Sequence, residues 1–178
     1  MKGDKVSINT VTKVYKFLDP GGEIAKLGRS GVAIEDLLER YRENLREVKI
    51  VKGNVFLLEG IEYIWKAVTG TTGLTPFNED NSHIGVGDGT DEEKASQTGL
   101  TGANKFYKKV DSGYPRVDGN KIIFRATFGP DEANFTWNEW TVANGPDDSA
   151  VNLNRKRENL GTKSAGATWV LTVELSIS

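Results

Sequence analysis

A glycine-rich stretch followed by carboxylates is the first segment whose residue types could support chemistry. Gly85-Val-Gly-Asp-Gly89 resembles a phosphate-binding loop, but it lacks the GxxxxGK[ST] spacing, and no helix pattern follows that could bind a phosphate. Acidic residues at and after this stretch could offer oxygen ligands to calcium, although their spacing is not that of an EF-hand: Asp88, Asp91, Glu92 and Glu93. We therefore expect a glycine turn and an acidic surface loop, with no cofactor and no metal.

Two carboxylates farther along the chain, Glu132 and Glu139, are of the type that glycoside hydrolases use as acid and base. Residues seven apart in an extended strand point to opposite faces, so these two carboxyl groups do not flank one bond. The chain has one histidine, His83, and no cysteine, which disfavours a Ser-His-Asp centre, thiol catalysis and a multi-histidine metal site. We find no catalytic set and expect a protein that is not an enzyme.

Charge and hydropathy narrow the range of partners. A net charge of -2 argues against binding to a nucleic-acid backbone, which requires a basic face. Two short basic clusters could contact an acidic partner, but we expect them to be solvated: Lys105, Lys108, Lys109 and Arg155, Lys156, Arg157. No apolar run has the length of a membrane span, and residues 1–30 lack a signal-peptide core. We expect no nucleic-acid or membrane partner and synthesis in a cytoplasm.

The stretch that contains both carboxylates, residues 132–145, predicts the central strand of a sheet. Alternation places Phe135 and Trp137 on one side and Trp140 and Val142 on the other, so both faces carry large apolar groups. The pattern favours core or subunit-contact roles for Trp137 and Trp140. An aromatic platform that stacks on sugars or bases is the alternative.

The remainder of residues 83–178 predicts about six or more short strands, which is typical of an antiparallel β-sandwich. Residues 121–128 and 169–177 alternate most clearly. Six residues should be buried together between the sheets: Phe124, Phe128, Phe135, Trp169, Leu171 and Val173.

Two amphipathic helices are predicted before this region, over residues 33–48 and 55–69, with Trp65 as a core anchor of the second. We therefore expect an α+β fold: residues 1–53 form an N-terminal arm and an amphipathic helix, and residues 54–178 form a helix plus the sandwich. The a/d spacing within 33–48 also suggests a short helical bundle around an oligomer axis.

The β-prone arm is either an edge strand of its own domain or a segment that pairs with a neighbouring subunit. We expect the second, with contact through the arm and the two tryptophans of the central strand. The expected interaction residues are Val6, Ile8, Val11, Val14, Tyr15, Phe17, Trp137 and Trp140.

Several motifs in the second part of the chain resemble a family of tailed-bacteriophage virion proteins over about residues 55–178. The motifs are Ile84-Gly-Val-Gly-Asp-Gly89, Asn104-Lys-Phe-Tyr107 with Ser112-Gly-Tyr-Pro115, Phe124-Arg-Ala-Thr-Phe-Gly129, Glu132-Ala-Asn-Phe135 with Trp137-Asn-Glu-Trp140, Asn152-Leu-Asn-Arg-Lys156, and Leu160-Gly-Thr-Lys163 with Gly166-Ala-Thr-Trp169. The resemblance implies a small structural protein of the particle and carries over no catalytic residue.

The resemblance and the absence of a catalytic set lead to one main expectation. We expect a virion protein, made in the host cytoplasm, that decorates the capsid as a symmetric oligomer, with a trimer favoured. Its partners would be its own copies and the major capsid protein or another virion protein. The alternatives are a tail or baseplate component, and a carbohydrate-binding β-sandwich that uses Trp137, Trp140 or Trp169.

Overall fold

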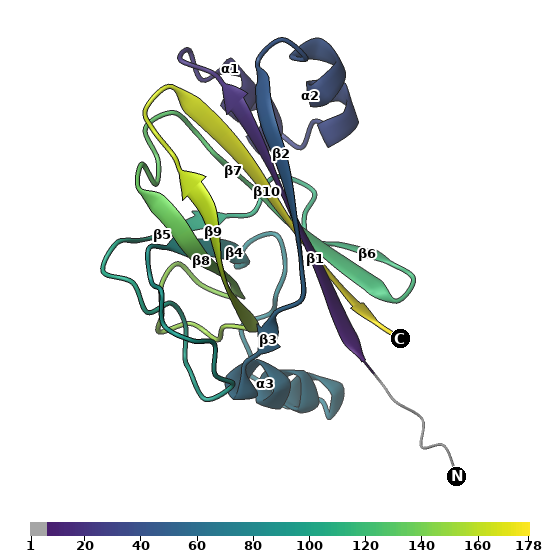
Figure 1. The fold of residues 1–178 in the computed structure, drawn as a ribbon. Helices are drawn as coiled ribbons and strands as arrows, with labels where there is room; N and C mark the ends of the chain where they lie inside the picture. Colours follow the sequence, from purple (N-terminus) through teal and green to yellow (C-terminus); the bar gives the residue numbers. More distant parts are fainter. Residues whose placement is uncertain (1–6) are drawn as a thin grey trace.

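The computed structural model describes residues 7–178, which form three helices and two antiparallel five-stranded sheets (Figure 1). The first sheet has the order β2 (Leu45–Lys52), β1 (Ile8–Leu18), β10 (Ala167–Ile177), β7 (Lys121–Phe128), β6 (Arg116–Asp118). The second has the order β3 (Val55–Phe56), β9 (Asn154–Thr162), β8 (Thr136–Ala143), β4 (His83–Gly87), β5 (Lys105–Lys109). The helices are α1 (Glu23–Arg29), α2 (Ile34–Arg40) and α3 (Leu58–Val68). The predicted mixture of helices with antiparallel strands is confirmed.

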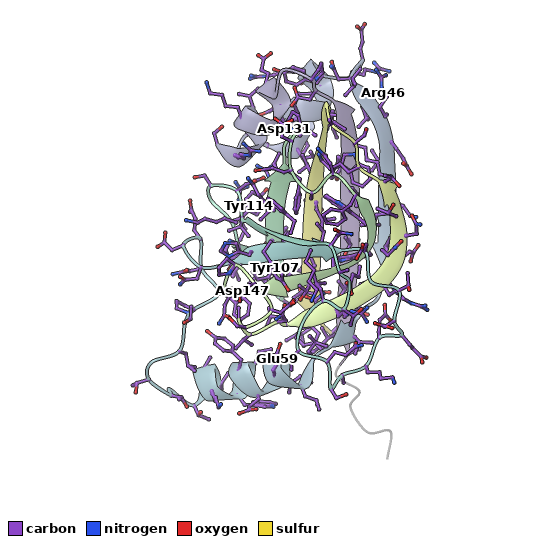
Figure 2. The ribbon with its side chains drawn as sticks, turned by 90° about the vertical axis from the view of Figure 1, so that its left-hand side faces the viewer. Arg46, Glu59, Tyr107, Tyr114, Asp131 and Asp147 are labelled. Carbon is purple, nitrogen blue, oxygen red and sulfur yellow. The ribbon has the colours of Figure 1, made fainter. Side chains whose placement is uncertain are left out.

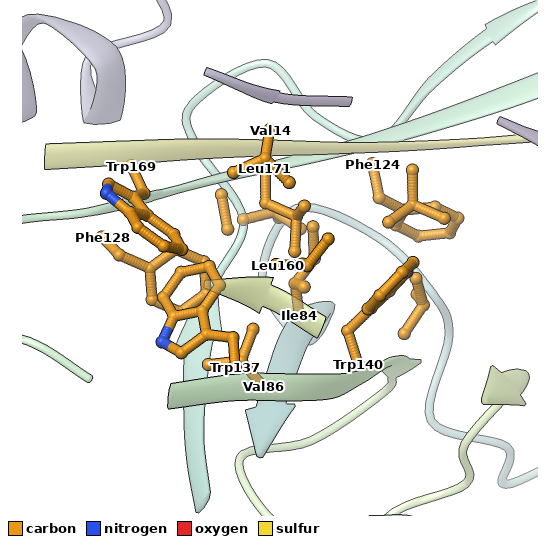
Figure 3. Packing of buried hydrophobic residues seen from close by; sticks show 14 of the residues in the cluster. Val14, Ile84, Val86, Phe124, Phe128, Trp137, Trp140, Leu160, Trp169 and Leu171 are labelled. Carbon is orange, nitrogen blue, oxygen red and sulfur yellow. The ribbon is translucent and has the colours of Figure 1, made fainter. Parts of the chain in front are cut away.

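The two sheets share one hydrophobic core, to which alternate residues of the long strands contribute (Figure 3). Trp137 lies edge-to-face with Phe128 and with Trp169, at ring-centroid distances of 4.7 and 4.8 Å. The predicted burial of Phe124, Phe128, Trp169, Leu171 and Val173 is confirmed, whereas Phe135 is partly buried at the edge of the core.

Both tryptophans of β8 point into this core, which corrects the expectation of opposite faces. The pairing of β8 with β9 shifts register between Trp137 and Glu139, as a β-bulge does. The extra residue reverses the alternation, so Trp137 and Trp140 lie in the same cluster and Glu139 points out of the opposite face. The strand is therefore not apolar on both sides.

Within residues 7–178 no separate N-terminal arm is observed, because β1 lies inside the first sheet. It pairs with β10 from Ile8↔Ile177 to Leu18↔Ala167, and β2 pairs with its other edge from Val11 to Phe17. Between Val11 and Phe17, β1 therefore offers no free edge to a neighbouring subunit. β1 and β2 share this sheet with β10, β7 and β6.

The predicted helix 33–48 is correct only in its first half. α2 ends at Arg40, and residues from Leu45 onward form β2. α1 and α2 cover the outer face of the first sheet through a second apolar cluster that includes Phe17, Ile24 and Leu37. The second predicted helix, over residues 55–69, is confirmed as α3 from Leu58 to Val68, whereas Val55 and Phe56 form β3. α3 lies at the other end of the molecule from α1 and α2 (Figure 1).

Candidate functional site

Glu139, one of the two candidate catalytic carboxylates, forms a buried ion pair. It lies 2.7 Å from the guanidinium of Arg155, and neither side chain is exposed. Its Oε1 also accepts hydrogen bonds from the backbone N–H groups of Gly89, Thr101 and Gly102, at 3.2, 3.0 and 2.7 Å. The carboxylate therefore holds the loop between β4 and β5 against the outer face of the second sheet.

Glu132 also makes internal contacts. Its carboxylate oxygens lie 2.7 Å from Arg29 Nη2 and 2.6 Å from Lys108 Nζ. Beside it, the buried Lys163 ammonium donates to Gly129 O and Asn134 Oδ1, at 2.7 and 2.9 Å. Burial lowers the pKa of Lys163 to about 8. Glu132 and Glu139 thus hold different loops and do not face a common substrate position.

The acidic loop after β4 is bound through its backbone. Arg155 donates to the carbonyl oxygens of Asp91 and Glu92, and Glu93 accepts from the backbone N–H of Arg157. No group of three or more potential metal ligands comes together anywhere in residues 7–178. Members of both basic clusters are bound within the chain and are not all solvated. Lys105 pairs with Asp148 at 2.5 Å, and Arg155 is fully buried.

Most of the expected interaction residues are not available to a partner. Trp137 and Trp140 have no exposed surface, and their indole N–H groups donate to Ala133 O and Thr12 Oγ1. Val14, Tyr15 and Phe17 are buried and Val11 is partly buried. Val6 lies outside the described residues, and Ile8 is exposed. A sugar platform built on Trp137, Trp140 or Trp169 is therefore wrong, because all three are buried.

An apolar cavity of about 530 Å³ lies between the two sheets at the end of the molecule where α3 is found. Core residues such as Phe124, Leu153 and Leu175 form part of its wall, and Ile64 of α3 contributes to it. Three exposed apolar residues from three strands lie on its rim: Ile8, Val117 and Ile177.

The polar side chains at the mouth of the cavity are already engaged. Lys121 Nζ lies 2.9 Å from Glu174, and Asn120 Nδ2 donates to Ile177 O at 2.6 Å. The cavity is thus suited to apolar groups rather than to a charged ligand.

The second apolar feature at this end is a row of apolar side chains on α3 that the rest of the chain leaves exposed. Leu58, Trp65 and Val68 are 57%, 64% and 72% exposed, and Ile61 lies among them, partly buried. We call these four residues the α3 stripe. Trp65 is therefore not the core anchor that its spacing predicted.

The side of α3 that does touch the body is narrow. A Cβ at Gly60 would lie 2.7 Å from Leu153 Cα, so glycine allows the close approach. Glu59 faces the sheets, where it accepts from the backbone N–H of Asn152 at 2.8 Å (Figure 2). We refer to the cavity rim and the α3 stripe together as the apolar end.

Sequence reasoning missed the apolar end. The apolar residues of 57–68 form a stripe of the width that an ordinary one-sided surface helix carries. The spacing therefore shows that the helix has an apolar side, but it does not show that part of this side is uncovered.

Comparison with protein-family models, with curated proteins and with solved structures finds no match for this chain. None of the helices formed by residues 7–178 has the length and hydrophobicity needed to cross a bilayer.

Proposed function

We propose that this chain is a non-enzymatic structural protein of a tailed-phage virion, most specifically a capsid decoration protein that assembles through its apolar end. The motif resemblance over residues 55–178 supports the virion assignment. The observation that carries the assembly role is the exposure of Trp65, Val68 and Val117, with the last 76% exposed. Large contiguous apolar surfaces on a folded chain mark interaction sites.

The architecture suits a rigid structural component of a particle. We interpret the two facing sheets as a β-sandwich, and buried ion pairs fasten its long loops, as Arg155 does for the acidic loop. Such fastening favours one fixed surface over an adaptable one. The proposed partners are the major capsid protein or another virion protein, and the proposed location is the virion.

We also propose a symmetric homo-oligomer, on grounds that differ from those in the sequence. The a/d spacing within residues 33–48 suggests a helical bundle around an oligomer axis, but the structure does not carry this argument. α2 ends at Arg40, and Leu37 is buried inside its own chain. The apolar end now supplies the reason for association, and it does not by itself favour three-fold symmetry.

A binding experiment with particles tests the function. Purified protein should co-sediment with capsids of its phage that lack it, and Val117→Asp should reduce the bound amount by roughly tenfold or more, because a charge then enters an apolar contact. Leu18→Asp is the matched control, since Leu18 is also exposed but lies where β1 ends, away from the apolar end. Equal binding of both variants would contradict the role of the apolar end. Binding to isolated tails but not to capsids would favour the tail or baseplate alternative.

A further inference from the structure

A lysine and an asparagine meet at the end of the ladder that β8 and β9 form. Lys163 directly follows β9 and Asn134 precedes β8, and the register that places Thr136 opposite Thr162 brings them together. The backbone N–H of Lys163 also donates to Phe135 O at 3.1 Å. Lys163 Nζ lies 2.9 Å from Asn134 Oδ1. Strand pairing therefore fixes this contact, unlike a contact between two free surface side chains.

The charge of this lysine is buried against neutral acceptors. Lys163 is 1% exposed, and its Nζ donates to Gly129 O and Asn134 Oδ1. Burial of an ammonium that is bonded to neutral oxygens is unfavourable, because neither acceptor cancels its charge. Burial lowers the pKa of Lys163 to about 8, so roughly a tenth of the chains carry the neutral amine at pH 7. A neutral lysine amine is a nucleophile.

The side-chain amide of Asn134 is held close to this amine. Its Nδ2 donates to Pro130 O at 2.9 Å, which fixes the orientation of the amide group. A C=O bond is about 1.2 Å long, so the amide carbon lies no more than about 4.1 Å from Lys163 Nζ. Attack requires a separation of about 3–3.5 Å, which a small movement of either side chain supplies. Asn134 is exposed, so a released ammonia molecule has a path to solvent.

We propose that Lys163 and Asn134 condense to an intramolecular amide cross-link after the chain has folded. The neutral Nζ of Lys163 attacks Asn134 Cγ, and a new C–N bond forms. The proton that the attacking nitrogen loses passes through water to Nδ2, the bond between Cγ and Nδ2 breaks, and ammonia leaves. The step consumes no oxidant and no further reactant. The cross-link closes residues 134–163, which include β8 and β9, into a covalent ring, and it replaces a buried charge by a neutral amide.

The reaction should be slow, because the site lacks a separate acid. The charged groups that act on Lys163 are Glu132, Asp131 and Arg29, and the first of these is already bonded to Arg29. Among the described residues, the group that donates to Asn134 Oδ1 is Lys163 itself. Proximity must then supply the rate, and well-oriented pairs reach effective concentrations of about 10⁵–10⁸ M. The freshly folded chain therefore carries the free ammonium, and the cross-linked chain accumulates over days.

Intact-protein mass spectrometry of the purified full chain tests the proposal. After about three days at about pH 9 and 37 °C, the wild-type chain should be lighter by about 17 Da, the mass of ammonia. Digestion with trypsin should then give a branched peptide that joins residues 126–155 to residues 158–178, because trypsin does not cleave at a modified lysine. An unchanged mass overturns the proposal, and so does a gain of about 1 Da alone, which is the mark of asparagine hydrolysis.

Three variants locate the reaction. Asn134→Ala removes the amide, and Lys163→Arg replaces the amine by a guanidinium that stays charged, so both should keep their full mass. Asn159→Ala is the matched control, since Asn159 is also exposed and its backbone carbonyl accepts from another lysine, Lys49. This control should lose about 17 Da like the wild type. The same loss from Asn134→Ala would place the reaction elsewhere and overturn the proposal, and the branched peptide of the wild type does not depend on whether a variant folds.

The pH profile gives a readout that a hydrogen bond alone would not produce. The rate should rise about tenfold per pH unit between about pH 6 and 8 and level off above about pH 9, because Lys163 becomes neutral over this range. The cross-linked chain should also unfold at a temperature roughly 10 °C higher, as expected when a loop of this length is closed. A rate that is constant between about pH 6 and 8 would contradict attack by the neutral amine. The cross-link does not depend on the proposed virion role, so failure of either leaves the other intact.

Discussion

The Arg155 guanidinium and the Glu139 carboxylate lie 2.7 Å apart on neighbouring strands, and neither side chain has exposed surface. Arg155 also donates to carbonyl oxygens of the acidic loop, and Glu139 accepts from three backbone N–H groups of the same loop region. A carboxylate that was weighed as half of a catalytic pair and an arginine that was expected to be solvated therefore act together as a clasp between a sheet and a loop.

Glu139→Ala should lower the free energy of unfolding by about 3–5 kcal/mol, because it leaves the Arg155 charge buried without its partner. Urea unfolding followed by circular dichroism measures this change. Glu158→Ala is the control, since Glu158 lies 3.9 Å from Lys49 at the surface, and exposed pairs contribute about 1 kcal/mol or less. Equal losses for the two variants would show that the clasp does not stabilise the fold.

Phe124→Ala should lower the free energy of unfolding by about 3–5 kcal/mol, as removing a packed ring from a core does. Phe124 is fully buried and lies edge-to-face with Phe77 at 6.3 Å. Val117→Ala removes apolar atoms at the exposed rim of the same cavity and should change stability little. A loss below about 1 kcal/mol for Phe124→Ala would mean that the cavity wall collapses to fill the space.

Stability should rise with pH between about 8 and 10 because of Lys163. Burial lowers the pKa of this ammonium to about 8 in the folded chain, below the value of 10.5 in the unfolded chain. The unfolded state therefore binds more protons in this range, and stability increases by up to about 1.4 kcal/mol per pH unit. Urea unfolding at successive pH values measures the slope.

Lys163→Met is the control for this pH dependence. It keeps an aliphatic side chain but removes the titrating group, so the slope between pH 8 and 10 should disappear. Above about pH 10 Tyr107 makes stability fall as pH rises. Burial and the hydrogen bond to Asp148 raise the pKa of its hydroxyl in the folded chain, so the folded chain then binds more protons than the unfolded chain. A wild-type stability that is flat or falls from pH 8 to 10 would contradict the assignment to Lys163.

Tryptophan fluorescence should separate Trp65 from the other three tryptophans. Trp65 is 64% exposed, whereas Trp137, Trp140 and Trp169 are buried. At low protein concentration, acrylamide should quench one component strongly, and Trp65→Phe should remove that component and shift the emission to shorter wavelength. If Trp65→Phe leaves quenching unchanged, Trp65 is covered within a single chain. Quenching that decreases as protein concentration rises would show that association covers Trp65.

The strands that alternate without interruption were predictable from the sequence. Residues 121–128 and β10 carry apolar side chains at every second position, and most of these side chains are buried as that period predicts, although Ile177 is exposed. The bulge in β8 was not predictable in this way. A single inserted residue leaves no mark in the composition, yet it turns Trp137 and Trp140 to the same face.

The errors at the N-terminal side have a different origin. Leu45 and Val48 satisfy a helical period, but pairing with β1 stabilises an extended conformation there instead. The pairing of β1 with β10 was not predictable either, because partners 149 to 169 residues apart in the sequence have no local signature. The candidate site was missed for a related reason: amphipathicity shows that α3 has an apolar side, but only the structure shows how little of it is covered.

The pairing of β1 with β10 has a consequence for synthesis of the protein. β1 lies between β2 and β10, and β10 is synthesised long after β1. At about 5–20 residues per second, roughly 10–30 seconds separate the appearance of β1 and β10. Until β10 has left the ribosome, β1 and β7 lack the strand that joins them, so the first sheet cannot be completed before then. Nascent chains held just before β10 should be sensitive to protease along β1, and release of β10 should confer protection in a single step.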